Sequence, residues 1–211
     1  GSTIPAHYIL PPIIGQFHQL YPEVQIHLEV GDSGSIIQAI HAGDLDVGLV
    51  GAKEDLEGLR YLEIARDELK LVVGVGHNKM LSFVKNQPLH KWPWIVREQG
   101  SGTRKAMEES LQRRDIGWKE LNIQATVSST QAVLACVRSG LGVSMVSSLA
   151  ADESLKRHEV VELPDVVDAS QRIFYVLINT QREHYPATKA FIRHMGIDEN
   201  NTCVMPEGKR I

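Results

Sequence analysis

The chain has 211 residues, enough for one large domain or two small ones of roughly 100 residues each. Hydrophobic residues make up 43% and charged residues 23%, so an ordinary globular core can form without a metal or disulfide staple. The formal net charge of −4 argues against a broad basic surface that grips nucleic acid.

The two cysteines give no support to zinc or thioredoxin-like chemistry, because neither has a CxxC neighbour. Cys136 lies in an apolar run and is expected to be a buried, inert thiol, whereas Cys203 lies in a polar tail. No apolar run approaches the ~18 residues of a membrane span, and no signal peptide is present. We therefore expect a cytoplasmic protein that does not contact a membrane. The loop-like start at Gly1 and Ser2 indicates a fragment that lacks its N-terminal part, or a cloning remnant.

Helices and strands alternate in the first half of the chain. Pro11 and Pro12 favour a helix start, and Gly43 favours a helix end. Strict alternation of apolar and polar residues predicts a strand at 24–30. The elements expected here, in chain order, are a helix at 13–20, a strand at 24–30, a helix at 36–42, and strands at 47–50 and 69–75. This order predicts a largely parallel sheet.

A second α/β unit follows. The elements expected in it, in chain order, are a strand at 94–96, a helix at 103–115, a strand at 123–127, a helix at 130–138, strands at 142–146 and 172–178, and a helix at 185–194. Residues 198–211 are polar and are expected to fray.

Hydroxyl side chains precede three of the expected helices. They are Ser2 and Thr3 before the first, Ser101 and Thr103 with Gly102 before the middle one, and Ser129 and Thr130 before the next. A helix start carries about half a positive charge and unpaired N–H donors, so it binds anions without lysine. Each loop alone is explained by helix capping. Three of them favour a ligand site, because ligands of open α/β folds lie beyond the carboxyl ends of the strands.

Weaker candidates for the same ligand are Ser33, Ser35 and Arg104. The segment around Ser33 superficially resembles a serine-protease nucleophile, but no matching histidine and aspartate can be placed. The G-x-S-x-G, Walker A and G-x-G-x-x-G patterns are all missing, and the nine histidines lack metal-ligand spacing. We expect no catalytic residues, no cofactor and no metal.

Five segments together resemble the effector-binding domain of LysR-type transcriptional regulators. They are STIPAHYILP at 2–11, FHQLYPEV at 17–24, AGDLDVGL at 42–49, GSGTR at 100–104, and STQAV at 129–133 running into SGLGV at 139–143. Each motif is weak alone, but five in this order are specific, and the resemblance spans residues 1–196.

The resemblance implies an α/β fold like that of type 2 periplasmic binding proteins. Two Rossmann-like lobes are joined by two crossover strands, and the ligand binds in the cleft. Lobe I would comprise residues 1–75 plus 172–211 and lobe II residues 76–171, with crossovers near 71–76 and 167–172. The ligand residues of the family map to Ser2, Thr3, Ser101, Gly102, Thr103, Ser129 and Thr130, with Gly51 and Ala52 facing the same cleft. The G-S-G-T-R loop looks like the branch near regulators of sulfur and carbon assimilation, which favours a small inorganic or carboxylate anion.

Two parts of the family pattern are absent: the strand before the Ser2-Thr3 loop, and the N-terminal helix-turn-helix that binds DNA. The resemblance thus implies a ligand-sensing domain that controls DNA-dependent transcription and contacts DNA only through the missing domain. The full protein would form a homodimer or homotetramer. The alternative is a periplasmic solute-binding protein of the same fold. An enzyme on this fold is disfavoured, because the sequence offers no convincing acid/base pair.

Overall fold

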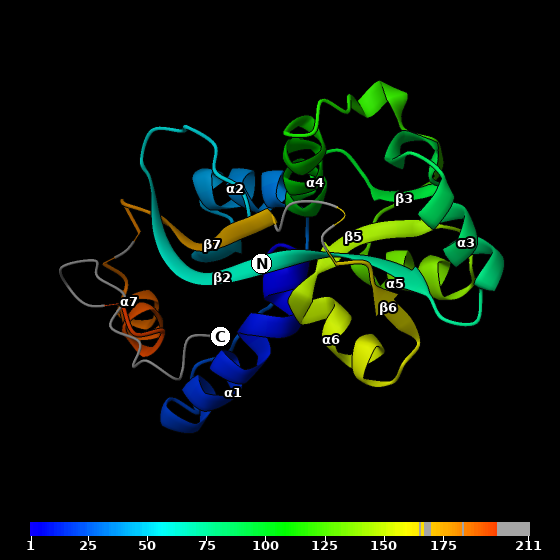
Figure 1. Cartoon of the computed structure of the whole chain (residues 1–211). Coiled ribbons are helices and arrows are strands. Elements are labelled where there is room, and N and C mark those ends of the chain that lie inside the picture. Colours follow the sequence, from blue (N-terminus) through cyan, green and yellow to red (C-terminus); the bar gives the residue numbers. More distant parts are fainter. Residues whose placement is uncertain (165, 167–169, 183, 198–211) are drawn as a thin grey trace. The chain divides into compact units, whose positions relative to one another are not determined.

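The computed structural model describes residues 1–164, 166, 170–182 and 184–197. The chain divides into two compact units, Gly1–Arg66 with Ile173–Ile211 as unit 1 and Asp67–Arg172 as unit 2 (Figure 1). The sequence predicts the corresponding lobe boundaries at 75/76 and 171/172. The predicted frayed tail at 198–211, which contains Cys203, lies outside the described residues, as does part of the predicted crossover at 167–172.

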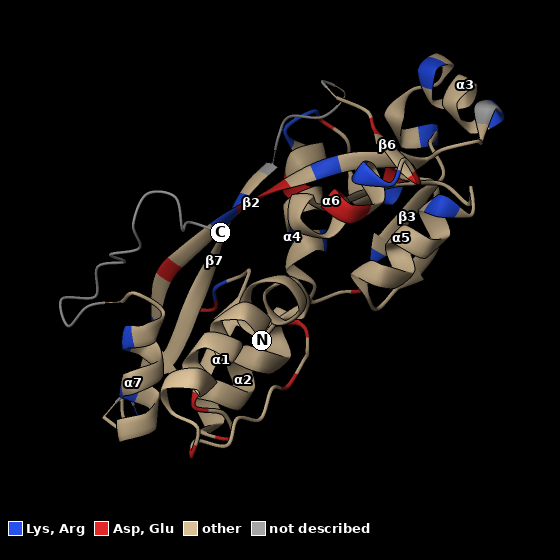
Figure 2. Cartoon of the chain, turned by 90° about the horizontal axis from the view of Figure 1, so that it is seen from below, with Lys and Arg blue, Asp and Glu red and all other residues tan. Residues whose placement is uncertain are grey.

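Unit 1 packs helices against a short piece of the sheet. Its elements are η1 (Pro5–Ile9), α1 (Leu10–Leu20), α2 (Ser33–Ala42), β1 (Val47–Val50), the first part of β2 (Leu59–Gly74), most of β7 (Ser170–Asn179) and α7 (Pro186–His194). β1 runs antiparallel to β7, and β7 lies beside β2. The apolar face of α1 buries Phe17, whose ring meets that of Phe191 on α7 edge to face at 5.0 Å. Neither α1 nor α2 carries a Lys, Arg, Asp or Glu (Figure 2).

The predicted strand at 24–30 is wrong. These residues form no ladder, and the neighbouring Gly31 makes only an isolated parallel bridge with Ser2. Apart from half-buried Val24, the side chains of 24–30 are exposed. Alternation alone does not make a strand, because a strand also needs a hydrogen-bonded neighbour along its length.

Unit 2 contains a larger piece of the sheet. Its elements are the second part of β2, α3 (Asn78–Asn86), η2 (Leu89–Lys91), β3 (Trp94–Arg97), α4 (Gly102–Gln112), η3 (Trp118–Glu120), β4 (Ile123–Val127), α5 (Thr130–Arg138), β5 (Val143–Ser147), α6 (Ser148–Lys156) and β6 (Val160–Glu162). β3 runs parallel to β4 and β5, whereas β2 runs antiparallel to β5 and β6. The sheet is therefore mixed rather than largely parallel, because β2 runs antiparallel to β5 and β6, and β7 runs antiparallel to β1.

The core of unit 2 lies between the sheet and α4. Leu69, Leu71 and Val73 of β2 pack there with Trp94 and Met145, and Ala106, Met107 and Leu111 close it from α4. The Trp94 indole is fully buried, and its N–H donates to the Leu89 carbonyl at 2.9 Å. Cys136 on α5 is a free thiol and is half-buried rather than buried as predicted.

Candidate functional site

Three helices of unit 2 start where parallel strands end. β3 leads to α4, β4 to α5 and β5 to α6. Because β3 is parallel to both β4 and β5, all three carboxyl ends lie at one edge of the sheet. The N–H groups and positive dipole ends of three helices of nine or more residues therefore lie along this edge.

Thr130 begins α5 and is held by a buried arginine. The Arg97 guanidinium, 4% exposed, donates from Nη1 to Thr130 Oγ1 at 2.9 Å. The same guanidinium makes a two-pronged ion pair with Glu98, both contacts being 2.7 Å. Since Thr130 Oγ1 already accepts a hydrogen bond from a cation, its own O–H proton is directed to some other acceptor.

Thr103 in the first turn of α4 is held in the same way by a second arginine. Arg172 Nη1 donates to Thr103 Oγ1 at 2.9 Å, while its Nε and Nη2 contact Asp67 Oδ2 at 2.8 and 2.7 Å. The other Asp67 oxygen accepts from the Ser148 hydroxyl at 2.9 Å. Burial lowers the pKa of Arg172, and the charge of Asp67 opposes that effect. The guanidinium stays protonated, because arginine is not deprotonated in proteins.

The two arrangements share one design of carboxylate, guanidinium and hydroxyl. In each, the arginine charge is balanced by an acid, so neither pair adds net positive charge. Attraction for an anion therefore comes from the helix starts and from the two oriented hydroxyl protons.

The neighbouring serines act as helix caps. Ser101 Oγ accepts from the Arg104 N–H at 3.4 Å, and Ser129 Oγ accepts from the Ala132 N–H at 3.1 Å. This is the capping role that serine plays at helix starts in general. Gly102, between Ser101 and Thr103, is the first residue of α4.

Sequence reasoning missed Ser147, a buried residue that adjoins this edge. It lies directly opposite Leu69 of β2, so it shares the sheet face that α4 covers and that Asp67 also occupies. Among the described residues, the Ser147 hydroxyl meets no hydrogen-bond partner. A buried hydroxyl without a partner is costly, so a further polar partner would stabilise this position.

In unit 1, most of the predicted residues lie together. The Ser2 N–H donates to the Leu49 carbonyl at 2.7 Å, and Thr3 Oγ1 donates to the Gly31 carbonyl at 3.4 Å. The Gly51 N–H donates to Ser33 Oγ at 3.3 Å, and both Ser2 and Ser33 are buried.

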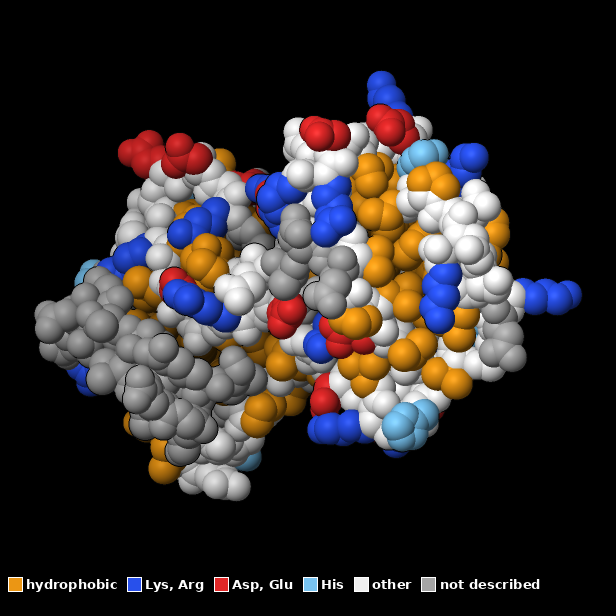
Figure 3. All heavy atoms as spheres, viewed as in Figure 1, with side chains coloured by type: hydrophobic (Ala, Val, Ile, Leu, Met, Phe, Trp, Pro, Cys, Tyr) orange, Lys and Arg blue, Asp and Glu red, His pale blue; other side chains and the backbone are white. Residues whose placement is uncertain are grey.

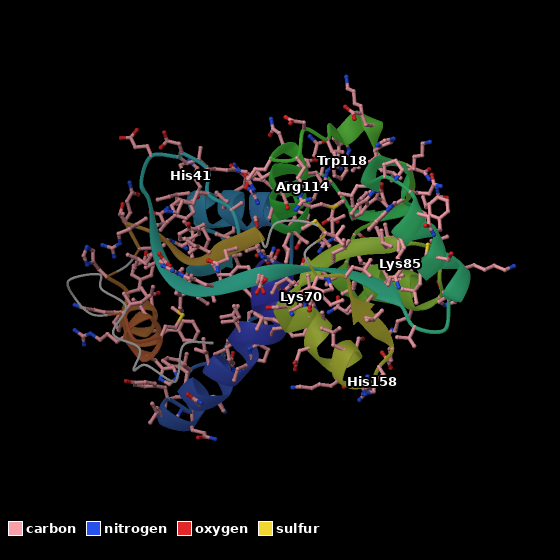
Figure 4. All side chains as sticks on the ribbon, in the orientation of Figure 1. His41, Lys70, Lys85, Arg114, Trp118 and His158 are labelled. Atoms are coloured by element: carbon pink, nitrogen blue, oxygen red, sulfur yellow. The ribbon has the colours of Figure 1, made fainter. Side chains whose placement is uncertain are left out.

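Two weaker candidates have contacts within their own segments. The Ser35 hydroxyl donates to the Asp32 carbonyl at 3.0 Å, and its N–H is capped by the Asp32 carboxylate. Arg104 Nε pairs with Glu108 at 2.8 Å, and its guanidinium lies 4.3 Å from the ring centroid of Trp118, which Figure 4 labels. These contacts are typical of a helix-surface arginine.

Comparison with known proteins decides the family. The family model described as "LysR substrate binding domain" matches residues 2–196. The chain belongs to the LysR substrate-binding domain family. A "Probable RuBisCO transcriptional regulator" from Synechocystis sp. is 31% identical over 199 residues, which are 92% of this chain and 58% of that protein. The chain thus spans little more than half the length of this relative.

Solved structures support the fold of this LysR-family chain. The Synechocystis PCC6803 CcmR regulatory domain in complex with 2-PG superposes with a TM-score of 0.78 at 21% identity, over 92% of each chain. The effector-binding domain of QuiR in complex with shikimate gives a TM-score of 0.76 at 18% identity, over 92% of this chain and 95% of that one. The fold prediction is confirmed, and the family favours a sensing domain over the periplasmic alternative.

No metal or membrane feature emerges from the part of this LysR-family chain that the structure describes. Within it, no group of three His, Cys, Asp or Glu side chains is placed to hold a metal ion. The helices formed by those same residues include none long and apolar enough to cross a bilayer.

Arginines 97 and 172 are the main functional candidates that sequence reasoning missed. Each adjoins a run of apolar strand residues, WIV before Arg97 and IFYVLI after Arg172. A charged residue beside a buried strand is a usable signal, because such a charge must find a partner.

Proposed function

We propose that this chain is the effector-sensing domain of a transcription regulator and that it binds a small anion at the starts of α4 and α5. The observation that carries the proposal is the pair of threonine hydroxyls, Thr103 and Thr130, each oriented by a buried arginine at a helix start. Such hydroxyls serve as hydrogen-bond donors, and the helix starts favour negative charge.

The relatives support this class of ligand. The CcmR regulatory domain was solved with 2-PG and the QuiR effector-binding domain with shikimate, which carries a carboxylate. Ser101, Gly102 and Ser129 of unit 2 belong to the proposed binding residues beside the two threonines. Ser2, Thr3 and Gly51 of unit 1 stay predictions from the sequence. Ser33, Ser35 and Arg104 remain weaker candidates.

The proposal assigns no catalysis to the chain, in keeping with a relative named as a transcriptional regulator. The whole protein would contact DNA through a separate N-terminal domain, act in the cytoplasm and assemble as a homodimer or homotetramer. Apolar side chains visible on the face of unit 2 in Figure 3 support self-association. Among the residues of that unit that the structure describes, the large exposed apolar side chains are Val75, Phe83, Leu141 and Val161.

The binding test uses calorimetry on the 211-residue chain with sulfate, inorganic phosphate and small carboxylates. We expect Thr103→Val and Thr130→Val each to weaken binding of the best anion by roughly tenfold to a hundredfold, the worth of a hydrogen bond to a charged group. Thr126→Val, at an exposed threonine of β4, is the matched control and is expected to leave affinity unchanged. Unchanged affinity in both variants would overturn the site, and no binding of any anion would overturn the ligand class.

A further inference from the structure

One ion pair joins the two places where the chain passes between the units. The chain passes from unit 1 to unit 2 between Arg66 and Asp67, and it returns between Arg172 and Ile173. Asp67 lies on β2 and Arg172 on β7, and the two are 105 residues apart in the sequence. Their side chains are nonetheless bonded to each other at 2.7–2.8 Å.

This ion pair is withdrawn from water. The side chain of Arg172 is 6% exposed and that of Asp67 is 0% exposed. Breaking such a pair leaves an uncompensated buried charge, so the pair fixes the two crossover points relative to each other. The second Asp67 oxygen is bonded to Ser148, which anchors the pair to the first turn of α6 as well.

The remaining edge of the same guanidinium holds the proposed anion donor. Arg172 Nη1 donates to Thr103 Oγ1 at 2.9 Å. A guanidinium is planar and rigid, so its Nη1 cannot move toward Thr103 without reorienting the Nε and Nη2 atoms that bind Asp67. A displacement of the Thr103 hydroxyl is therefore expected to disturb the ion pair between Arg172 and Asp67.

Arg97 provides the contrast within the same molecule. It also holds a threonine, but its acid is the adjacent residue, Glu98. None of these residues lies at a passage between the units. The acid that pairs with Arg97 is thus its neighbour in the sequence, whereas the acid that pairs with Arg172 lies on another strand, β2.

We propose that Arg172 is a positioning residue. It couples anion binding at Thr103 to β2 and β7, the two strands on which the chain crosses between the units. This inference rests on the proposed function, because it takes Thr103 as an anion contact. A ligand shifts a conformational equilibrium only by binding one state better, and the alignment of Thr103 with Arg172 supplies that difference at the crossover.

The first test is a double-mutant cycle with sulfate, or with phosphate if that binds more tightly. Arg172→Lys keeps a charge for Asp67 but cannot serve Asp67 and Thr103 together. We expect Arg172→Lys and Thr103→Val each to weaken binding about tenfold and the double variant to weaken it about tenfold as well, because both remove the same oriented donor. Combining Arg172→Lys with Thr130→Val is expected to give about a hundredfold loss, because Thr130 is held by Arg97 and Thr103 by Arg172.

The second test measures the crossover directly by hydrogen exchange at residues 65–69 and 171–175. Saturating anion is expected to slow exchange there in the unmodified chain and in Thr130→Val. In Arg172→Lys, anion raised to saturation is expected to leave exchange at these residues unchanged. If Arg172→Lys does not fold, the neutral pair of Asp67→Asn with Arg172→Gln replaces it.

The outcomes separate this inference from the proposed function. The coupling is overturned if the losses of anion affinity in Arg172→Lys and Thr103→Val multiply in the double variant. It is also overturned if anion slows hydrogen exchange at residues 65–69 and 171–175 in Arg172→Lys as it does in the unmodified chain. In both cases anion binding at Thr103 stands. Failure of the unmodified chain to bind any of the anions overturns both.

Discussion

Four hydroxyl side chains at two helix starts of unit 2 divide into two kinds by the hydrogen bonds that their oxygens accept. Ser101 and Ser129 accept from main-chain N–H groups of their own helices, whereas Thr103 and Thr130 accept from buried guanidinium groups. The serines are therefore occupied in starting the helices. The threonines have hydroxyl protons directed away from cations, and they are the better anion donors.

This division predicts different consequences for removing each kind. Ser101→Ala and Ser129→Ala are each expected to lower the free energy of unfolding by about 1 kcal/mol, the usual cost of a lost N-cap. They are expected to weaken anion binding less than the two threonine variants do. Urea unfolding and calorimetry on the same preparations check both halves, and a capping variant with full stability would contradict the assignment.

The threonines were predictable from the sequence, but their arginine partners were not. A hydroxyl beside a glycine at an expected helix start is a local pattern. The bond between Arg172 and Asp67 joins residues 105 positions apart, and Arg97 reaches Thr130 across 33 positions. Such pairings depend on which strands become neighbours, and no local pattern encodes that.

At Gly142 the neighbouring main chain leaves no room for a side chain. A Cβ added there would lie 2.1 Å from the Pro93 carbonyl oxygen, which accepts a hydrogen bond from Val143 N–H at 2.8 Å. Relief would require a shift of the main chain that precedes β3. Gly142→Ala is therefore expected to destabilise the chain by about 1–3 kcal/mol or more, the range for overpacking.

The control for that prediction is Gly15→Ala in the exposed part of α1. An added Cβ meets nothing within 4 Å there. Alanine favours a helix interior over glycine by up to about 1 kcal/mol, so this variant is expected to be neutral or more stable. Thermal melts of the two variants side by side should move in opposite directions, and a destabilised Gly15→Ala would contradict the argument.

At the scale of elements, the sequence predicted most helices and strands and missed several short ones. The helices at α1, α2, α4, α5 and α7 and the strands at β1, β3, β4 and β5 were all expected at close to their observed bounds. The short helices α3 and α6 and the strand β6 were not expected. β2 begins ten residues before the expected strand, at residue 59 rather than 69, because the charged residues of LRYLEIARDE masked its alternation.

One carboxylate at the contact between α5, α6 and β6 makes the free energy of unfolding depend on pH. Glu159, just before β6, accepts from Arg138 at the end of α5 at 2.8 Å and from Ser154 of α6 at 3.0 Å. The hydrogen bonds from Arg138 and then Ser154 lower the pKa of the Glu159 carboxyl. A lowered folded-state pKa adds stability above the ordinary carboxyl range, and this stability is lost as pH falls through the folded value.

Glu159→Gln is therefore expected to be slightly less stable than the unmodified chain at pH 7. The gap should narrow as pH falls through the lowered folded-state pKa, because the carboxyl is then protonated and neutral like the amide. Urea midpoints measured across pH 3–7 check this, with Lys156→Gln as a control for removing an exposed charge at the end of α6. A gap that persists at low pH would show that Glu159 contributes by packing alone.

At the scale of the whole molecule, the two units differ in whether they are continuous in the sequence. Unit 2 is one continuous stretch, Asp67–Arg172, whereas unit 1 is assembled from two stretches. The core around Trp94 and Met145 draws only on residues of unit 2. In unit 1, β1 pairs with β7, and Phe17 packs on Phe191.

We therefore expect residues 67–172 alone to give a cooperative urea transition with helical circular dichroism. Residues 1–66 alone are expected to stay unfolded, since a short strand without its partner is not stable in water. A fragment 67–172 that lacks a cooperative transition would contradict the independence of this core.

The split construction of unit 1 has a consequence during translation. The ribosome delivers α1 early, but its aromatic partner on α7 arrives only after all of unit 2 has been made. At ordinary elongation rates this interval is on the order of ten seconds. For that time the apolar face of α1 lacks its contact with α7, so a nascent chain of this protein is expected to be a chaperone client at α1, and pauses late in the message would lengthen that exposure.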